Sequence, residues 1–94
     1  MARPIGAAVE RIAHTPEEAF GRVVTELRTK RGMTQEDLAH ALGYHLSYIG
    51  QVERGKKSPT LRTMFNMAQL FDLPASKLLA RAEKHQAKNL PPRK

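Results

Sequence analysis

Residues 34–57, TQEDLAHALGYHLSYIGQVERGKK, carry the pattern that decides the fold. The cap residue Thr34 predicts the start of one short helix, and Gly43 predicts its end. A second short helix is expected from about residue 46 to residue 54. Glycine adopts the positive φ that an abrupt reversal requires, and the small Ala39 allows the two helix backbones to approach closely. We therefore predict two helices that cross over a tight turn.

The second helix of this pair has two opposite faces. At about 100° per residue, Ile49 and Val52 share one face, which is apolar. Ser47, Gln51 and Arg54 lie on the other side of the helix. A glutamine can bond an adenine in two places, and an arginine can bond a guanine or a phosphate. The apolar face is expected to hold the helix on the domain while the polar face projects outward.

Two apolar or small residues of the same helix also bear on function. Gly50 lies between the two faces, where a glycine costs about 1 kcal/mol relative to alanine. This cost is explained if the helix backbone approaches another molecule closely, such as the wall of a DNA groove. Leu46, near the start of the helix, is expected to touch a thymine methyl group.

Three more helices are predicted around this pair. The first follows the capping sequence TPEE at residues 15–18 and repeats apolar residues at the spacing of one helix face. The fourth is capped by Thr60 or Ser58, and the fifth opens at Pro74. The apolar residues of these helices are Phe20, Val23, Val24 and Leu27 in the first, Leu61, Met64, Phe65, Ala68 and Phe71 in the fourth, and Ala75, Leu78, Leu79 and Ala82 in the fifth.

Length and composition exclude several classes of protein. Ninety-four residues make one domain, and the lack of cysteine excludes a disulfide scaffold and a cysteine-based zinc site. The four histidines are too scattered for a metal site, and the chain has no nucleophile motif or glycine-rich phosphate loop. We expect no enzyme, no cofactor and no small-molecule substrate. The apolar runs are too short for a membrane span and no secretory signal is recognisable, so we expect a cytoplasmic, prokaryotic protein.

The helix pattern divides the chain into three parts. Residues 1–14 are predicted to be an N-terminal arm, residues 15–86 the helical domain, and residues 87–94 a disordered basic tail. The formal net charge is +7, and more than half of this excess lies outside residues 15–81. A basic protein suits a polyanionic partner, but the same charge also serves solubility, so charge alone does not decide the function.

The helix pair resembles the helix-turn-helix of the lambda-repressor/Cro-like family, also called the XRE family. The matching residues are Leu27-Arg28, RGMTQEDLA at 31–39, Gly43, and YIGQVERG at 48–55. The resemblance extends over about residues 17–81 and implies an all-α, five-helix, lambda-repressor-like DNA-binding domain. The run SYIGQVERGKKSPTL is also similar to the controller proteins of restriction-modification systems.

This resemblance implies a role for each residue of the motif. His45 stands where the family often has a serine or threonine cap, and Leu46 stands where a polar base reader is common. An ordinary solvated surface is the alternative interpretation of the polar residues. Contacts with base edges are implied for His45, Leu46, Ser47 and Gln51. Contacts with phosphates are implied for Thr34, Gln35, Tyr48, Arg54, Lys56 and Lys57, and a structural ion pair is implied for Arg28 and Glu53.

The resemblance and the polar helix face together predict a sequence-specific transcriptional regulator that binds double-stranded DNA. One recognition helix makes few base contacts, so we expect a homodimer on a palindromic operator. An antitoxin-like or bridging module, which would bind a protein through residues 1–14 and 83–94, is the alternative. A non-specific nucleic-acid or RNA binder is a third hypothesis. The dimer interface is expected on the fourth and fifth helices, at the exposed members of the set Met67, Leu70, Leu78, Leu79 and Ala82.

Overall fold

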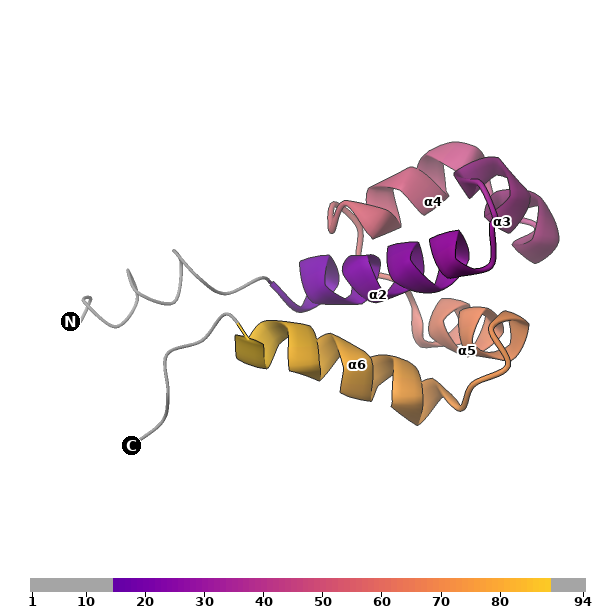
Figure 1. Cartoon of the computed structure of the whole chain (residues 1–94). Coiled ribbons are helices and arrows are strands. Elements are labelled where there is room, and N and C mark those ends of the chain that lie inside the picture. The colour runs from indigo at the N-terminus through magenta and orange to yellow at the C-terminus, as the bar shows by residue number, and fades with distance from the viewer. Residues whose placement is uncertain (1–14, 89–94) are drawn as a thin grey trace, which may run out of the picture.

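The structure is a computed structural model that describes residues 15–88, and this part of the chain forms five helices without a strand (Figure 1). The predicted all-α architecture is confirmed. The predicted N-terminal arm, residues 1–14, and residues 89–94 of the predicted tail lie outside the described residues. The helices are α2 (Pro16–Lys30), α3 (Gln35–Leu42), α4 (Leu46–Glu53), α5 (Leu61–Leu70) and α6 (Ala75–Lys88).

The last helix is longer than expected. Residues 87 and 88, which the sequence pattern assigns to the tail, continue α6 instead. The helix begins just after Pro74, as predicted. Among the described helices, none is both long enough and apolar enough to cross a membrane.

Helix α2 is the central element of the fold. It contacts α4 on one side and α6 on the other, and α3 packs against α4 and α5 (Figure 1). Helices α5 and α6 also contact each other. The α3–α4 pair is therefore held on one flank of α2, and α6 runs along the opposite flank.

Threonine caps fix the start of three helices. Thr15 and Glu18 form the predicted capping box of α2, and Thr34 and Asp37 form an equivalent box on α3. For α5, the cap is Thr60 rather than Ser58, because the Thr60 hydroxyl accepts the backbone N–H of Thr63 at 3.0 Å. These local bonds set where each helix begins.

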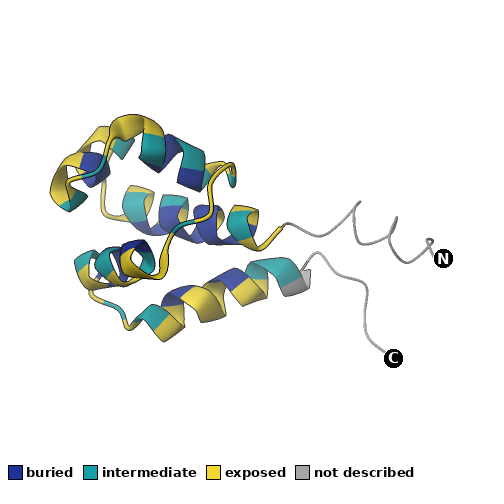
Figure 2. Cartoon of the chain, turned by 180° about the vertical axis from the view of Figure 1, so that it is seen from behind, coloured by how far each residue is buried: buried dark blue, intermediate teal, exposed yellow. Residues whose placement is uncertain are grey.

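Most residues of the apolar helix faces that the sequence predicts form the core, whereas Leu61, Phe65 and Leu79 are exposed. Figure 2 shows the buried positions turned towards the spaces between the helices. The most deeply buried large side chains are Leu38, Ile49, Met67, Leu78, Val23, Val24 and Val52. Three residues considered for a dimer interface, Met67, Leu78 and Ala82, are thus core residues, whereas Leu79 is 44% exposed and Leu70 is half-buried.

Helix α4 approaches α2 so closely that two glycines are required. A Cβ atom at Gly21 would lie 2.5 Å from the carbonyl oxygen of Val52 and would also collide with the carbonyl group of Glu53. A Cβ atom at Gly55 would lie 2.9 Å from the backbone nitrogen of Glu18. Because these obstacles are backbone atoms, they cannot rotate away. The C-terminal end of α4 therefore rests directly on the first half of α2.

Because of this contact, we expect a single methyl group added at Gly21 to destabilise the fold strongly. We expect Gly21→Ala to lower the free energy of unfolding by about 1–3 kcal/mol, because overpacking at a backbone contact forces the helices apart. Urea denaturation monitored by circular dichroism measures the change.

Gly50→Ala is the matched control, since Gly50 is also inside a helix. Outside its own helix backbone, the nearest atoms to an added Cβ there belong to the flexible Arg54 side chain, at 3.0 Å. We expect the control to be neutral or to gain up to about 1 kcal/mol from the higher helix propensity of alanine. Equal effects of the two substitutions would contradict the proposed α2–α4 contact.

Candidate nucleic-acid interface

The turn between α3 and α4 has the predicted geometry. Gly43 has a φ of 76°, in the left-handed region, and its N–H caps the end of α3. Ala39 is buried where α3 packs on α4. The chain needs only Gly43, Tyr44 and His45 to pass from one helix to the next. The short turn therefore fixes the direction in which α4 leaves the domain.

Helix α4 has one buried face and one polar face that lacks partners. Ile49 and Val52 have no exposed surface, so they anchor the helix as predicted. On the other side, Ser47 and Arg54 are exposed and Gln51 is half-buried. None of these three side chains makes a hydrogen bond or ion pair with another residue of the described chain. Their donors and acceptors are available to a ligand.

The start of α4 extends this available surface. His45 is the N-cap residue, but unlike Thr15, Thr34 and Thr60 its side chain makes no capping hydrogen bond. The first N–H groups of a helix have no acceptor within the helix and attract negative charge. Next to this end, the side chain of Leu46 is 47% exposed. Both residues implied to contact bases at the helix start are therefore accessible.

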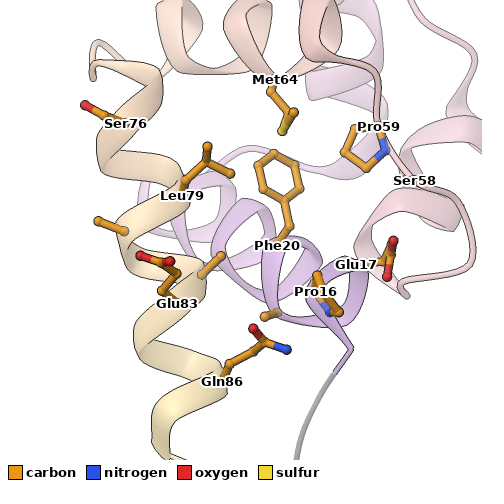
Figure 3. A pocket seen from close by; sticks show the side chains of 13 residues that line it. Pro16, Glu17, Phe20, Ser58, Pro59, Met64, Ser76, Leu79, Glu83 and Gln86 are labelled. Atoms are coloured by element: carbon orange, nitrogen blue, oxygen red, sulfur yellow. The ribbon is translucent and has the colours of Figure 1, made fainter.

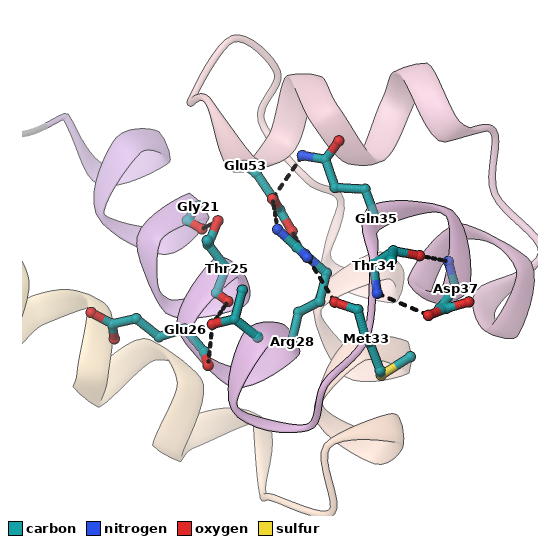
Figure 4. A network of polar contacts seen from close by, with 10 residues as sticks. Gly21, Thr25, Glu26, Arg28, Met33, Thr34, Gln35, Asp37 and Glu53 are labelled. Atoms are coloured by element: carbon teal, nitrogen blue, oxygen red, sulfur yellow. Dashed lines mark hydrogen bonds and ion pairs between the residues drawn. The ribbon is translucent and has the colours of Figure 1, made fainter.

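An ion pair joins α2 to the C-terminal end of α4, as the family resemblance implies. Arg28 donates two hydrogen bonds to Glu53, from Nε to Oε2 at 2.6 Å and from Nη2 to Oε1 at 3.0 Å (Figure 4). Its Nη1 donates to the carbonyl oxygen of Met33 at 2.8 Å. The pair is largely shielded from water, with 12% of the Arg28 side chain and 5% of the Glu53 side chain exposed. Arg28 thus connects α2 to α4 through Glu53, and to the loop after α2 through Met33.

The pKa of Glu53 reflects this environment. Burial of the carboxyl opposes its ionisation, but the hydrogen bonds donated by Arg28 and Gln35 outweigh that effect and hold the pKa below its ordinary value. Glu53 is therefore a carboxylate at neutral pH and keeps Arg28 in place.

Gln35 has a structural role that the sequence does not reveal. Its amide Nε2 donates to Oε1 of Glu53 at 2.9 Å, which adds α3 to the network between α2 and α4 (Figure 4). The second N–H and the carbonyl of the amide remain for another partner. The phosphate contact implied for Gln35 thus stays a prediction.

The other residues implied to contact phosphate surround α4. The Thr34 hydroxyl already caps α3 by accepting the Asp37 N–H at 2.9 Å. Tyr48 is half-buried, with its ring edge-to-face with that of Tyr44 at an interplanar angle of 72° and its hydroxyl 3.4 Å from that of Thr63. It is therefore supported by α5 and lies at the edge of the polar face. Lys56 and Lys57 are exposed in the loop after α4.

A second surface feature lies apart from these residues. An apolar groove of about 550 Å³ is formed where α2, the loop before α5, α5 and α6 meet (Figure 3). Its lining includes Phe20, Pro59, Met64 and Leu79. No residue of the polar face of α4 contributes to it.

Two helices crossing at a glycine turn, with the second anchored on one face and polar on the other, define a helix-turn-helix domain. The chain belongs to the helix-turn-helix family HTH_3, whose model matches residues 24–78. This confirms the resemblance noted from residues 31–39 and 48–55.

Known proteins are similar to this chain in sequence, in fold or in both. The uncharacterized HTH-type transcriptional regulator YazB of Bacillus subtilis is 34% identical over 61 residues, which cover 65% of this chain and 88% of that protein. The restriction-modification controller protein C.AhdI from Aeromonas hydrophila superposes with a TM-score of 0.62 and 38% identity, over 65% of this chain and 92% of that chain. The controller protein C.Esp1396I, as a tetramer in complex with its natural 35 base-pair operator, has a TM-score of 0.68 at 22% identity, over 79% and 97% of the two chains.

The ion pair predicts a dependence of stability on pH. Because the folded-state pKa of Glu53 is depressed, its stabilising effect is complete above the ordinary carboxyl pKa and is lost as the pH falls through the folded-state value. We expect Glu53→Gln to lower the free energy of unfolding at neutral pH by about 2–3 kcal/mol, because it leaves Arg28 without its counter-charge. The loss should shrink as the pH falls below the ordinary carboxyl pKa.

Urea titrations at several pH values measure this effect. Glu36→Gln is the control, since Glu36 is an exposed carboxylate on α3 near the same network. A pH profile of Glu53→Gln parallel to that of the unaltered chain would contradict the role given to the pair.

Proposed function

We propose that this chain is a sequence-specific transcriptional regulator that inserts α4 into the major groove of double-stranded DNA. The observation that carries the proposal is the polar face of α4, whose side chains have no partners in the described chain while Ile49 and Val52 anchor the opposite face. Membership of the helix-turn-helix family supports it. The protein would act in the cytoplasm, by binding rather than by catalysis.

Base recognition is assigned to the start of α4 and to its polar face. In helix-turn-helix complexes, the N-terminal residues of the recognition helix contact the base edges. Gln51 suits adenine, Ser47 is a small donor and acceptor, and the exposed Leu46 suits a thymine methyl group. His45, the N-cap residue of α4, makes no capping hydrogen bond, and its imidazole would join this set.

Phosphate contacts would position this helix in the groove. Thr34 and Gln35 stand at the start of α3, where the helix N-terminus favours a phosphate. Tyr48, at the edge of the polar face, and the exposed Lys56 and Lys57 would contact the backbone on the other side. These contacts make the affinity sensitive to salt without conferring sequence preference.

A homodimer on a palindromic operator is the proposed active form. Two recognition helices can then enter successive major grooves about 34 Å apart. Leu61 and Phe65 on α5 and Leu79 on α6 are 65%, 56% and 44% exposed, although all three are large apolar residues. We assign the dimer interface to this apolar surface of α5 and α6. The solved tetramer of C.Esp1396I on its operator shows that this fold can assemble on DNA in more than one copy.

The proposal predicts which base pairs depend on Gln51. Selection of bound sites from random duplexes should give a consensus with the unaltered chain. For Gln51→Ala, we expect discrimination to fall by about 1–3 kcal/mol at one or two base pairs and to persist elsewhere.

Gln69→Ala is the matched control, because Gln69 is an exposed glutamine on α5. It should leave the selected site unchanged. A consensus that Gln51→Ala does not alter would remove Gln51 from base recognition, and the lack of any consensus with the unaltered chain would refute the proposed function.

The interface predicts the assembly state. Phe65→Glu combined with Leu79→Glu places two charges in the apolar surface, so we expect the sedimentation coefficient to drop from that of a dimer to that of a monomer. Affinity for a palindrome should fall far more than affinity for a single half-site. Gln69→Glu adds a charge on α5 and serves as the control. A double variant that still sediments as a dimer would place the interface elsewhere.

A further inference from the structure

We propose that Arg54 reads a base, and that Gly50 is the residue that allows it to do so. The family resemblance implies only a phosphate contact for Arg54, as expected for a residue at the C-terminal end of the recognition helix. The inference rests on the proposed function, since it assigns a specificity-determining side chain within that same interface.

Packing does not explain the glycine at position 50. At Gly21, the atoms that exclude a side chain are backbone atoms of another helix. At Gly50, the nearest atoms outside its own helix backbone all belong to the Arg54 guanidinium, with Nη1 at 3.0 Å and Cζ and Nη2 at 3.8 Å from an ideal Cβ position. The guanidinium therefore occupies the space that a side chain at residue 50 would fill. Gly50 is buried, although Ser47 and Arg54 on either side of it along the helix are exposed.

Because it lies beside Gly50, the positive charge of Arg54 is closer to the N-terminus of α4 than the Arg54 backbone is. Side chains on an α-helix lean towards its N-terminus, so Arg54 covers the position four residues earlier. One turn corresponds to about 5.4 Å of helix length. The guanidinium thus lies beside the middle of α4, next to the face that carries Ser47 and Gln51, instead of beyond the helix end.

The hydrogen-bonding capacity of Arg54 is unused within the described chain. Glu53, the neighbouring carboxylate, is already bonded to Arg28 and Gln35. Within the described residues, the Arg54 side chain makes no ion pair or hydrogen bond, and the exposed Lys56 and Lys57 remain for the phosphates.

A guanidinium in the middle of a recognition helix matches guanine. Its parallel N–H groups fit O6 and N7 of that base in the major groove. We therefore assign to Arg54 a guanine in each half-site, close to the base pairs read by Ser47 and Gln51.

Site selection and salt titration with the full-length chain test this assignment. For Arg54→Ala, we expect a preference for guanine at one position to fall by about 10- to 100-fold while the rest of the consensus persists. Lys57→Ala is the control for a phosphate contact. It should weaken all sequences alike and reduce by about one the slope of log affinity against log salt concentration.

Substitution of Gly50 tests the mechanism separately. Gly50→Met fills the space taken by the guanidinium and should remove the same guanine preference. In a chain that already carries Arg54→Ala, it should have little further effect on the preference at that base position. Circular dichroism of each variant confirms that it is folded. The inference is overturned if Arg54→Ala weakens every sequence equally, as Lys57→Ala does, while the consensus itself survives. That result would leave the proposed function standing, whereas a chain that selects no consensus would refute both.

Discussion

The orientation of α4 depends on its contact with α2. The backbones meet at Gly21 without room for a methyl group, and the pair formed by Arg28 and Glu53 closes the same junction through side chains. The first constraint is steric and the second is electrostatic, so they respond to different perturbations. Together they hold a helix of only eight residues rigidly enough to project its polar side chains in one direction.

The polar residues of the helix pair fall into two groups. Glu53, Arg28 and Gln35 bond to one another within the domain, whereas the polar face of α4 projects outward. Glu53 lies one residue from Arg54, yet its carboxylate is shielded and bonded to two partners. A free carboxylate at this position would repel phosphate and compete for the arginine. Because Arg28 neutralises this carboxylate and Gln35 donates a hydrogen bond to it, the surface that faces outward keeps a positive character.

Local patterns in the sequence were sufficient to predict the helices, the turn at Gly43 and the anchoring by Ile49 and Val52. They were not sufficient where distant segments meet. Gly21 and Gly50 look alike in sequence, since each lies inside an expected helix. Only at Gly21 does the backbone of a neighbouring helix explain why a side chain is excluded. Periodicity also placed Phe65 among the apolar residues of its helix without deciding between core and surface, and it is 56% exposed. Two residues after the end of α5, Asp72 has a φ of 59°, in the left-handed region that glycine occupies after α2, α3 and α4.

The lack of a side-chain cap at the start of α4 affects the thermodynamics of binding. A threonine side chain accepts a backbone hydrogen bond at the start of α2, α3 and α5, but the His45 side chain does not do so for α4. The N–H groups in the first turn of α4 can therefore bind a hydrogen-bond acceptor from another molecule. Any acceptor that binds there completes the helix at the same moment as it is recognised. Under the proposed function, folding of α4 and binding of DNA would be linked equilibria, and the protein would melt at a higher temperature with its DNA site bound.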